Sequence, residues 1–315
     1  MSTNRQSKRS RRAGLLAVAA GCFLVAGQAG AQEKSATQPS VDPITTSASG
    51  PAFGTYDPSG AFGADKTVGI EHLFLPWEDV DLATLKDAET YAQERGRTLL
   101  ITVEPWTWSK EWRTTPEELR DRILAGKYDE NMRAICQIVG QFQRPVTIRW
   151  GHEMEDKSGQ FTWANWKPED YVKAYRHVVD ICRNEAPNAK FMWSPLGEKG
   201  LDAYYPGDEY VDTVGLSVFA LQQYDKDHFG KDRTFTEVLQ PKYDRVAKYK
   251  KSIEVAEYGC SGDEQYVKTC FEGSKVANPD TPELKSVTYF NDKEVYPWPG
   301  NYGLPDWRIR KDLIN

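Results

Sequence analysis

The sequence has no apolar run long enough to cross a lipid bilayer. Its one apolar stretch, residues 15–25, is shorter than the ~20 residues that a membrane-spanning helix needs. The chain also has no excess of positive charge, because its 40 Lys and Arg are outnumbered by 46 Asp and Glu and its net charge is −6. A chain of this charge is poorly suited to bind nucleic acid or anionic lipid electrostatically. These absences exclude an integral membrane protein and argue against a nucleic-acid partner.

Several motifs of cofactor and metal sites are missing as well. No Gly-x-Gly-x-x-Gly turn follows a predicted strand, which disfavours dinucleotide binding. The pair His152-Glu153 is not followed by the second histidine of a zinc protease, since position 156 is Asp. Ser194 and Ser261 lack the Gly-x-Ser-x-Gly context of a serine hydrolase. We therefore expect an activity that needs no metal and no cofactor.

The first 31 residues have the pattern of a secretory signal peptide. Five basic residues precede the apolar stretch, and small residues close it at Ala29-Gly30-Ala31. Ser10-Arg11-Arg12 is also typical of twin-arginine signals, which leaves the export route open, and Cys22 leaves lipid attachment as a minor alternative. Residues 32–50 are rich in Ser, Thr and Pro and predict a disordered leader. We expect a secreted or periplasmic protein after cleavage near Ala31.

Four cysteines remain after the signal segment, and they allow three pairings. None has the Cys-x-x-Cys spacing of a zinc site. Cys260 and Cys270 flank a short segment, whereas Cys136 and Cys182 lie on two predicted helices. An oxidising compartment permits both bonds. We expect Cys260 to lie within bonding distance of Cys270 and regard Cys136 and Cys182 as the second candidate pair.

Short apolar runs alternate with helical patterns over residues 51–315. Strands are predicted at residues 53–56, 70–75, 98–103, 146–149, 190–193, 211–218, 253–257 and 285–290. Helices are predicted between most of them, at residues 81–95, 117–124, 129–142, 168–184, 237–249 and 264–271. This alternation favours one α/β domain built as a (β/α)8 TIM barrel, with an open doubly wound sheet as the main alternative. We expect the domain to be a monomer.

Two glutamates follow predicted strands and form the candidate catalytic pair. The fourth strand leads into Arg149-Trp150-Gly151-His152-Glu153, and the seventh ends at Glu257. In a TIM barrel such residues meet at the C-terminal face. Two carboxylates there can hydrolyse a glycosidic bond, one as acid and the other as nucleophile or base. A raised pKa suits the acid, and the positive charge of Arg149 favours an ionised partner.

Aromatic residues make up 12% of the chain, including 10 Trp and 16 Tyr. Flat rings can stack on the apolar faces of pyranose sugars, and several lie near predicted strand ends. We expect Trp163 and at least one of Trp106 and Trp108 to face a sugar-binding cleft. A position in the hydrophobic core is the alternative for each of them.

An ordered set of segments resembles glycoside hydrolase family 26 over roughly residues 52–310. It comprises Arg149-x-x-His152-Glu153-Met154, the Trp163 region, Trp193-Ser194-Pro195, Val255-Ala256-Glu257-Tyr258-Gly259 and Asp306-Trp307-Arg308. The resemblance implies a (β/α)8 retaining enzyme with Glu153 as acid/base and Glu257 as nucleophile, positioned by His152 and Arg149. It implies a sugar platform that includes Trp163, and His72 is a weaker candidate for substrate binding.

The resemblance also implies a substrate class, with alternatives. Family members are mostly endo-β-1,4-mannanases, so β-1,4-mannan is the first expected substrate, followed by β-1,3-1,4-glucan or a bacterial exopolysaccharide. Two features depart from the family pattern. A tyrosine that many members carry after strand six corresponds to Phe219, with Tyr224 as a possible substitute, and Glu155-Asp156 replace the usual Asn-Gly. A non-catalytic polysaccharide-binding protein on the same fold therefore stays open.

Overall fold

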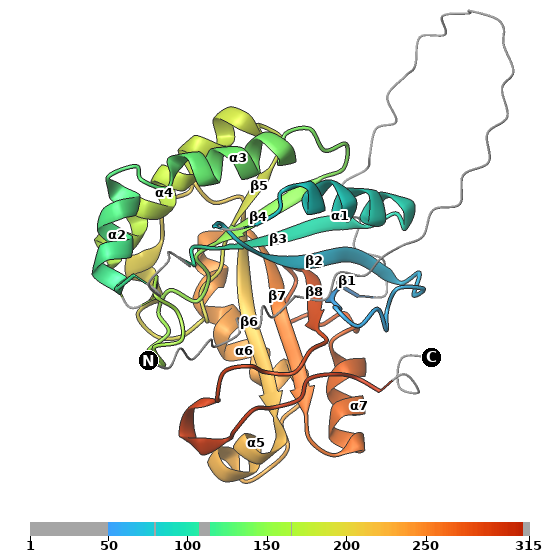
Figure 1. Cartoon of the computed structure of the whole chain (residues 1–315). Coiled ribbons are helices and arrows are strands. Elements are labelled where there is room, and N and C mark those ends of the chain that lie inside the picture. The colour runs from blue at the N-terminus through green and yellow to red at the C-terminus, as the bar shows by residue number, and fades with distance from the viewer. Residues whose placement is uncertain (1–49, 79, 107–113, 165, 311–315) are drawn as a thin grey trace, which may run out of the picture. The chain divides into compact units, whose positions relative to one another are not determined.

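Eight parallel strands close into a barrel in the computed structural model, which describes residues 50–310 except 79, 107–113 and 165. Each strand pairs with the next, and the last pairs with the first (Figure 1). The TIM-barrel prediction is confirmed, and the open-sheet alternative is wrong. The strands are β1 (Ala52–Tyr56), β2 (Val68–Pro76), β3 (Thr98–Glu104), β4 (Val146–Trp150), β5 (Lys190–Trp193), β6 (Thr213–Leu221), β7 (Ser252–Ser261) and β8 (Leu284–Phe290).

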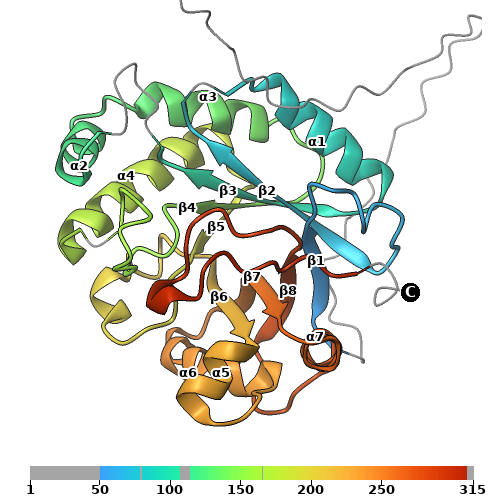
Figure 2. The ribbon, with the colours of Figure 1, turned by 60° about the horizontal axis from the view of Figure 1, so that its bottom comes forward.

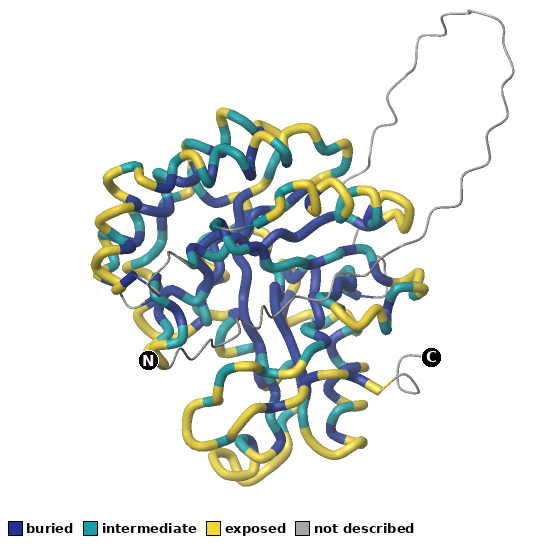
Figure 3. The backbone as a smooth tube through the Cα atoms, in the orientation of Figure 1, coloured by how far each residue is buried: buried dark blue, intermediate teal, exposed yellow. Residues whose placement is uncertain are grey.

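Helices surround the barrel and cover its strands, so that the strands are buried and the outward helix faces are exposed (Figure 3). In the described residues, none of these helices has both the length and the apolar composition needed to cross a membrane. The helices are α1 (Ala83–Glu94), α2 (Pro116–Leu124), α3 (Asp129–Val139), α4 (Pro168–Glu185), α5 (Gln222–Phe229), α6 (Phe235–Val246) and α7 (Glu264–Gly273), with short 3-10 turns η1 (Leu201–Tyr204), η2 (Ala247–Tyr249) and η3 (Pro299–Asn301).

Helix α5 was not among the helices expected from the sequence. Its segment, Gln-Gln-Tyr-Asp-Lys-Asp-His-Phe, has too few apolar residues to show a helical period. It is held instead by a polar contact, because the fully buried Asp225 accepts hydrogen bonds from Arg233 Nε at 2.8 Å and from the Tyr266 hydroxyl at 2.7 Å. Because this helix buries a paired carboxylate and not an apolar face, its sequence lacks the apolar periodicity from which a helix is predicted.

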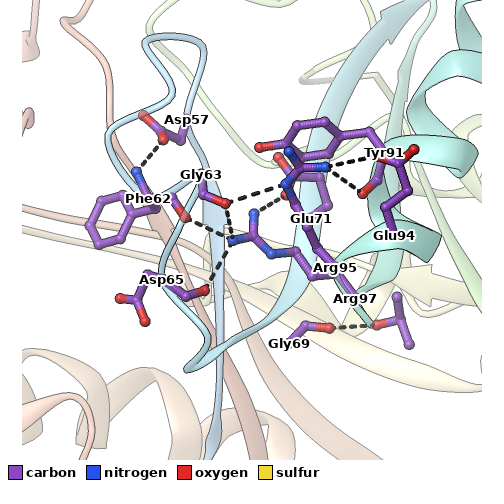
Figure 4. Close-up of polar contacts among 11 residues, drawn as sticks. Asp57, Phe62, Gly63, Asp65, Gly69, Glu71, Tyr91, Glu94, Arg95 and Arg97 are labelled. Atoms are coloured by element: carbon purple, nitrogen blue, oxygen red, sulfur yellow. Dashed lines mark hydrogen bonds and ion pairs between the residues drawn. The ribbon is translucent and has the colours of Figure 1, made fainter.

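The connection from β1 to β2, residues 57–67, contains no helix. The ring of Phe62 fills the space under it, fully buried and 5.9 Å from the ring of Phe53. Arg97, which lies before β3, donates hydrogen bonds to the carbonyls of Phe62 at 2.7 Å and Asp65 at 3.1 Å, and pairs with Glu71 at 2.6 Å (Figure 4). One guanidinium thus satisfies main-chain groups that a helix would have satisfied internally.

Of the two disulfide bonds in the described residues, one joins two helices and the other joins a helix to the barrel. Cys136 of α3 is bonded to Cys182 of α4, with their Cα atoms 5.2 Å apart. Cys260 of β7 is bonded to Cys270 of α7, with their Cα atoms 6.3 Å apart. Of the three pairings that the sequence allowed, the structure therefore contains the one that was expected. Such bonds fit an oxidising compartment.

Candidate active site

Strand β7 carries Glu257 within its length, not at its end as the sequence predicted. The strand continues to Ser261 alongside β6, with Glu257 opposite Ser217. Its register shifts against both β6 and β8 around Ala256, the pattern of a β-bulge. Ala256 packs inside the barrel with Ile70, and the next residue, Glu257, also points inward and bonds to Arg149. The bulge therefore sends two successive side chains into the barrel.

Glu153 lies on the loop after β4 in a strained backbone conformation. Its φ of 53° falls in the left-handed region, which costs a non-glycine residue on the order of 1 kcal/mol or more. A hydrogen bond from its amide to the carbonyl of Ser194, 2.8 Å long, holds this conformation. The carbonyl of Gly151 is fixed in turn by the hydroxyl of Tyr171 at 3.1 Å. The loop is thus built to present the Glu153 side chain to the cavity, which it lines.

The two carboxylates meet in the mouth of the barrel. A carboxylate oxygen of Glu153, one of Glu257 and a ring nitrogen of His152 all lie within 4.8 Å of one another. This is a spacing that could also hold a metal ion. However, the guanidinium of Arg149 is bonded directly to Glu257 and already supplies a positive charge to this carboxylate. The donor set therefore does not call for a metal to neutralise it.

Arg149 is fully buried and is held by a ring of hydroxyl groups. It donates hydrogen bonds to Ser194 Oγ at 2.8 Å, Thr102 Oγ1 at 3.2 Å and Ser217 Oγ at 3.3 Å, in addition to Glu257. The three hydroxyls come from β3, from the end of β5 and from β6. A planar guanidinium with five donors can satisfy all four groups at once. Arg149 is thereby fixed against the carboxylate whose charge it stabilises.

The two glutamates have different electrostatic surroundings. Burial, followed by the negative charge of Glu257, raises the pKa of Glu153 to about 8. Burial also raises the pKa of Glu257, but the charge and hydrogen bond of Arg149 act in the opposite direction. Because the guanidinium bonds to Glu257 and not to Glu153, we assign the retained charge to Glu257 and the retained proton to Glu153.

Two histidines lie beside this pair, and both are neutral. Burial lowers the pKa of His152 and of His72 well below the usual value, and the charge of Arg149 lowers both further. His152 Nε2 lies 3.9 Å from Glu257 Oε1. His72 is 2% exposed, bonds to Thr102 Oγ1 at 2.8 Å and is absent from the cavity wall. The expectation that His72 contacts substrate is therefore wrong, because the residue is packed inside the barrel.

The expected tryptophan platform is also wrong for Trp163. Its side chain is fully buried, and its indole N–H donates a hydrogen bond of 2.7 Å to the carbonyl of His152. Phe161 stacks on it with ring centroids 4.8 Å apart and lines the cavity in its place. Trp106 packs edge-on against Trp163 at 4.7 Å and does not line the cavity either. Trp108 lies outside the described residues. A buried indole usually finds a partner for its N–H, and here that partner is a carbonyl of the loop after β4.

A cavity of about 1040 Å³ opens above the carboxylates. Its floor is formed by inward-pointing aromatic rings near the ends of β1, β2, β6 and β8, namely Tyr56, Phe74, Phe219 and Phe290. Phe219 and Tyr224, both candidates from the sequence, line it, and their contact with substrate stays a prediction. The segment after β8 crosses the barrel mouth (Figure 2) and adds Trp298, whose ring lies 6.1 Å from that of Phe219. The result is a long cleft with aromatic walls.

Sequence reasoning missed several residues of the site. The hydroxyl groups around Arg149 and three of the floor aromatics were not singled out, although they occupy alternate positions of strands whose direction was predicted. Glu155 was noted only as a departure, yet its carboxylate accepts hydrogen bonds from the amides of Gly197 at 3.0 Å and Glu198 at 3.3 Å. It thus joins the loop after β4 to the loop after β5. The alternation of inward and outward side chains along the strands could have identified the hydroxyl groups and the floor aromatics. Nothing in the sequence indicates that the loops after β4 and β5 are hydrogen-bonded to each other.

Comparison with known proteins connects this arrangement to a family. The model of glycosyl hydrolase family 26 matches residues 117–255. The chain is 33% identical over 107 residues to a beta-1,3-xylanase from Vibrio sp, covering 32% of this chain and 22% of that protein. It is 26% identical over 261 residues to endoglucanase H from Acetivibrio thermocellus, covering 78% of this chain and 26% of that protein. The chain thus spans about a quarter or less of the length of these curated relatives.

A solved structure shares the barrel. The chain is similar to a modular endo-beta-1,4-mannanase from Cellulomonas fimi with a TM-score of 0.62 and 16% sequence identity. The superposition covers 80% of this chain and 68% of the mannanase chain. At this identity the similarity shows the fold, and the chemistry has to be argued from the side chains.

Proposed function

We propose that this chain, whose residues 117–255 match the model of glycosyl hydrolase family 26, is a retaining endo-β-glycanase that cleaves internal bonds of a β-linked polysaccharide. One observation carries this proposal. A buried glutamate, Glu257, and a partly buried one, Glu153, face each other with carboxylate oxygens within 4.8 Å, and only Glu257 is bonded to a guanidinium. Carboxyl groups about 5–5.5 Å apart are typical of retaining enzymes, whereas inverting enzymes separate them by about 6.5–9.5 Å to admit a water molecule.

In the first step of the proposed mechanism, Glu257 acts as nucleophile. Its carboxylate oxygen attacks the anomeric carbon, the bond from that carbon to the leaving sugar oxygen breaks, and the proton of Glu153 passes to the leaving oxygen. Arg149 favours this step because it keeps Glu257 ionised in a buried site. The pKa of about 8 keeps Glu153 protonated at neutral pH, ready to act as the acid.

In the second step, Glu153 acts as base. Once Glu257 is bound to the sugar as an ester, its negative charge is gone, and this charge is one of the causes that raise the pKa of Glu153. The pKa of Glu153 therefore falls in the intermediate, and its carboxylate can take a proton from water. The hydroxide equivalent attacks the anomeric carbon, the bond to Glu257 breaks, and both glutamates return to their starting states.

Among neutral polysaccharides we propose β-1,4-mannan first, since the mannanase from Cellulomonas fimi shares the barrel. The beta-1,3-xylanase and endoglucanase relatives support β-1,3-xylan and β-glucan as alternatives, and an exopolysaccharide is a further one. Reducing-end release from mannan, β-1,3-xylan and mixed-linkage glucan tests this directly. Binding of any of them without release of reducing ends would instead support a non-catalytic polysaccharide-binding protein.

Variants of the two glutamates test the roles. Glu257→Ala is expected to lower kcat by on the order of 10⁴-fold or more on every substrate. Glu153→Ala is expected to spare the first step on aryl glycosides with good leaving groups, which need little protonation, and azide should then yield a β-glycosyl azide. Glu130→Ala is a matched control, since the Glu130 side chain is 80% exposed on α3. Products of inverted anomeric configuration by NMR would refute the retaining mechanism.

We also propose that the protein acts outside the cytoplasm. The basic and apolar pattern of residues 1–31 supports export, and the disulfides Cys136–Cys182 and Cys260–Cys270 fit an oxidising compartment. N-terminal sequencing of the exported protein tests cleavage near Ala31.

A further inference from the structure

We propose that the substrate of this cleft carries carboxylate groups, which bind along a cationic wall formed by residues 231–245. The inference rests on the proposed glycanase function, because it concerns the glycan that occupies the same cleft. The wall consists of α6 and the segment before it, on the side of the cleft beyond Phe219, and it brings Lys231, Arg233, Lys242 and Arg245 to the cavity. Glu237 also lines this wall and pairs with Lys231, so the charge available to a ligand comes from the other three cations. A concentration of cations here is notable in a chain whose net charge is −6.

One face of α6 forms the wall. Val238, Pro241, Lys242 and Arg245 all line the cavity, and their spacing of three and four residues places them on one side of the helix. Lys242 and Arg245 therefore lie one after the other along the side of α6 that faces the cleft. A glycan chain that leaves the catalytic carboxylates toward α6 would pass them in succession.

Two of these cations are held in place without being fully neutralised. Arg245 donates a hydrogen bond of 2.7 Å to the carbonyl of Gly197, and in the described part of the chain no carboxylate pairs with it. Lys242 donates to the carbonyl of Leu196 at 2.5 Å and lies 3.4 Å from Glu198, whose side chain is 57% exposed. An ion pair that is open to water contributes little. Both side chains are thus positioned by main-chain oxygens and retain charge for a ligand.

The third cation stands over an exposed ring. The guanidinium of Arg233 lies 3.8 Å from the ring centroid of Phe229, and its Nε bonds to the buried Asp225 at 2.8 Å. Phe229 is 50% exposed in the cavity wall. An exposed ring beside a fixed guanidinium suits a sugar that stacks one face while its carboxylate meets the terminal nitrogens. A neutral sugar would use the ring but leave these donors unmatched.

The opposite side of the cleft is mainly acidic. Asp292 and Glu294, from the segment after β8, line it together with Glu153 and Glu257, and Lys293 is the cation among them. A carboxylate-bearing sugar at the point of cleavage would meet like charges there. The structure therefore places the acidic sugars of the substrate away from the scissile bond, toward α6, and a neutral sugar at the catalytic pair.

Binding without turnover tests the inference separately from catalysis. The full chain carrying Glu257→Gln is titrated, by calorimetry at low salt, with β-1,4-linked trimannuronate and with mannotriose, two sugars that differ only in carboxylate against hydroxymethyl groups. We expect trimannuronate to bind about 10-fold more tightly, and this preference to shrink as salt is added. Equal affinity, or tighter binding of mannotriose, would overturn the inference whatever the turnover panel shows.

Matched variants in the same background locate the preference. Arg245→Gln and Lys242→Gln are each expected to lower it severalfold, and Arg245→Lys is expected to restore part of it. Lys268→Gln removes the same charge from α7, away from the cavity wall, where the side chain is 53% exposed, and is expected to change nothing. A preference that survives the double variant Arg245→Gln/Lys242→Gln would also overturn the inference.

Discussion

Replacement of Glu153 by glutamine is expected to stabilise the fold, by an amount that grows as the pH rises. Glu153 has a pKa of about 8 in the folded protein, against 4.5 for an ordinary glutamate. Between these two values the folded chain holds a proton that the unfolded chain has released. The stability of the wild type therefore falls as the pH rises through this window, whereas the neutral amide of the variant contributes no such dependence.

The size of the effect follows from the two pKa values. At pH 5 an ordinary glutamate is only partly ionised, whereas at pH 7 it is almost fully ionised and Glu153 in the folded state is still mostly protonated. The difference in unfolding free energy between variant and wild type is then expected to widen by about 2–3 kcal/mol from pH 5 to pH 7. Glu257 titrates in both proteins, so its own contribution largely cancels in the difference.

Urea denaturation followed by tryptophan fluorescence at pH 5, 6 and 7, with the disulfides intact, measures this difference. Glu130→Gln, on an exposed part of α3, is the control for removing one carboxylate. A constant difference between Glu153→Gln and wild type over this range would refute the raised pKa and, with it, the assignment of Glu153 as the protonated partner. The same pKa predicts that kcat/KM declines above about pH 8 as the acid is lost.

Three further outcomes are expected. Arg149→Lys should lower kcat at least about 10²-fold with a smaller change in KM, because one ammonium cannot replace the bonds of a guanidinium. The acidic limb of the pH–rate profile should also move to higher pH, because the pKa of Glu257 rises. An acidic limb that does not move would argue against the ion pair. Trp163→Phe should cost about 1–3 kcal/mol of stability by leaving a loop carbonyl unpaired, whereas a raised KM at unchanged stability would restore its role as a sugar platform. Denaturation of double Cys→Ser variants should show a loss of about 4 kcal/mol for the Cys136–Cys182 bond and about 3 kcal/mol for Cys260–Cys270, because the first closes the longer loop; equal losses would contradict the loop-entropy account.

Helices and strands with a regular pattern of apolar residues were predictable from the sequence, because the spacing of those residues indicates which face of the element is buried. Strand β5 matches its predicted range, and α4 ends within a residue of expectation. Helix α5 was missed because its buried residue is a carboxylate, Asp225, whose partners lie on other elements. Pattern alone could not reveal that these groups pair.

The candidate site was predictable only in part, for a related reason. Glu153 and Glu257 were found because strand ends of a barrel converge. The burial of Trp163 could not be foreseen, because loop residues have no period that distinguishes inside from outside. The hydrogen bonds of Glu155 join two loops that are distant in sequence, so they too depend on the closed barrel.

In strand β7 the alternation of inward and outward side chains reverses at Ala256, where the register shifts. Before this point, the odd-numbered residues Ile253 and Val255 pack in the main core. After it, Glu257 reaches the cavity, and Gly259 abuts Phe219. The number of residues between the halves, not their identity, sets which way Glu257 faces. Substitutions in the packing half can therefore accumulate during evolution without turning Glu257 away from the cavity. Insertion or deletion of a single residue there would instead reverse the side of the strand on which Glu257 lies.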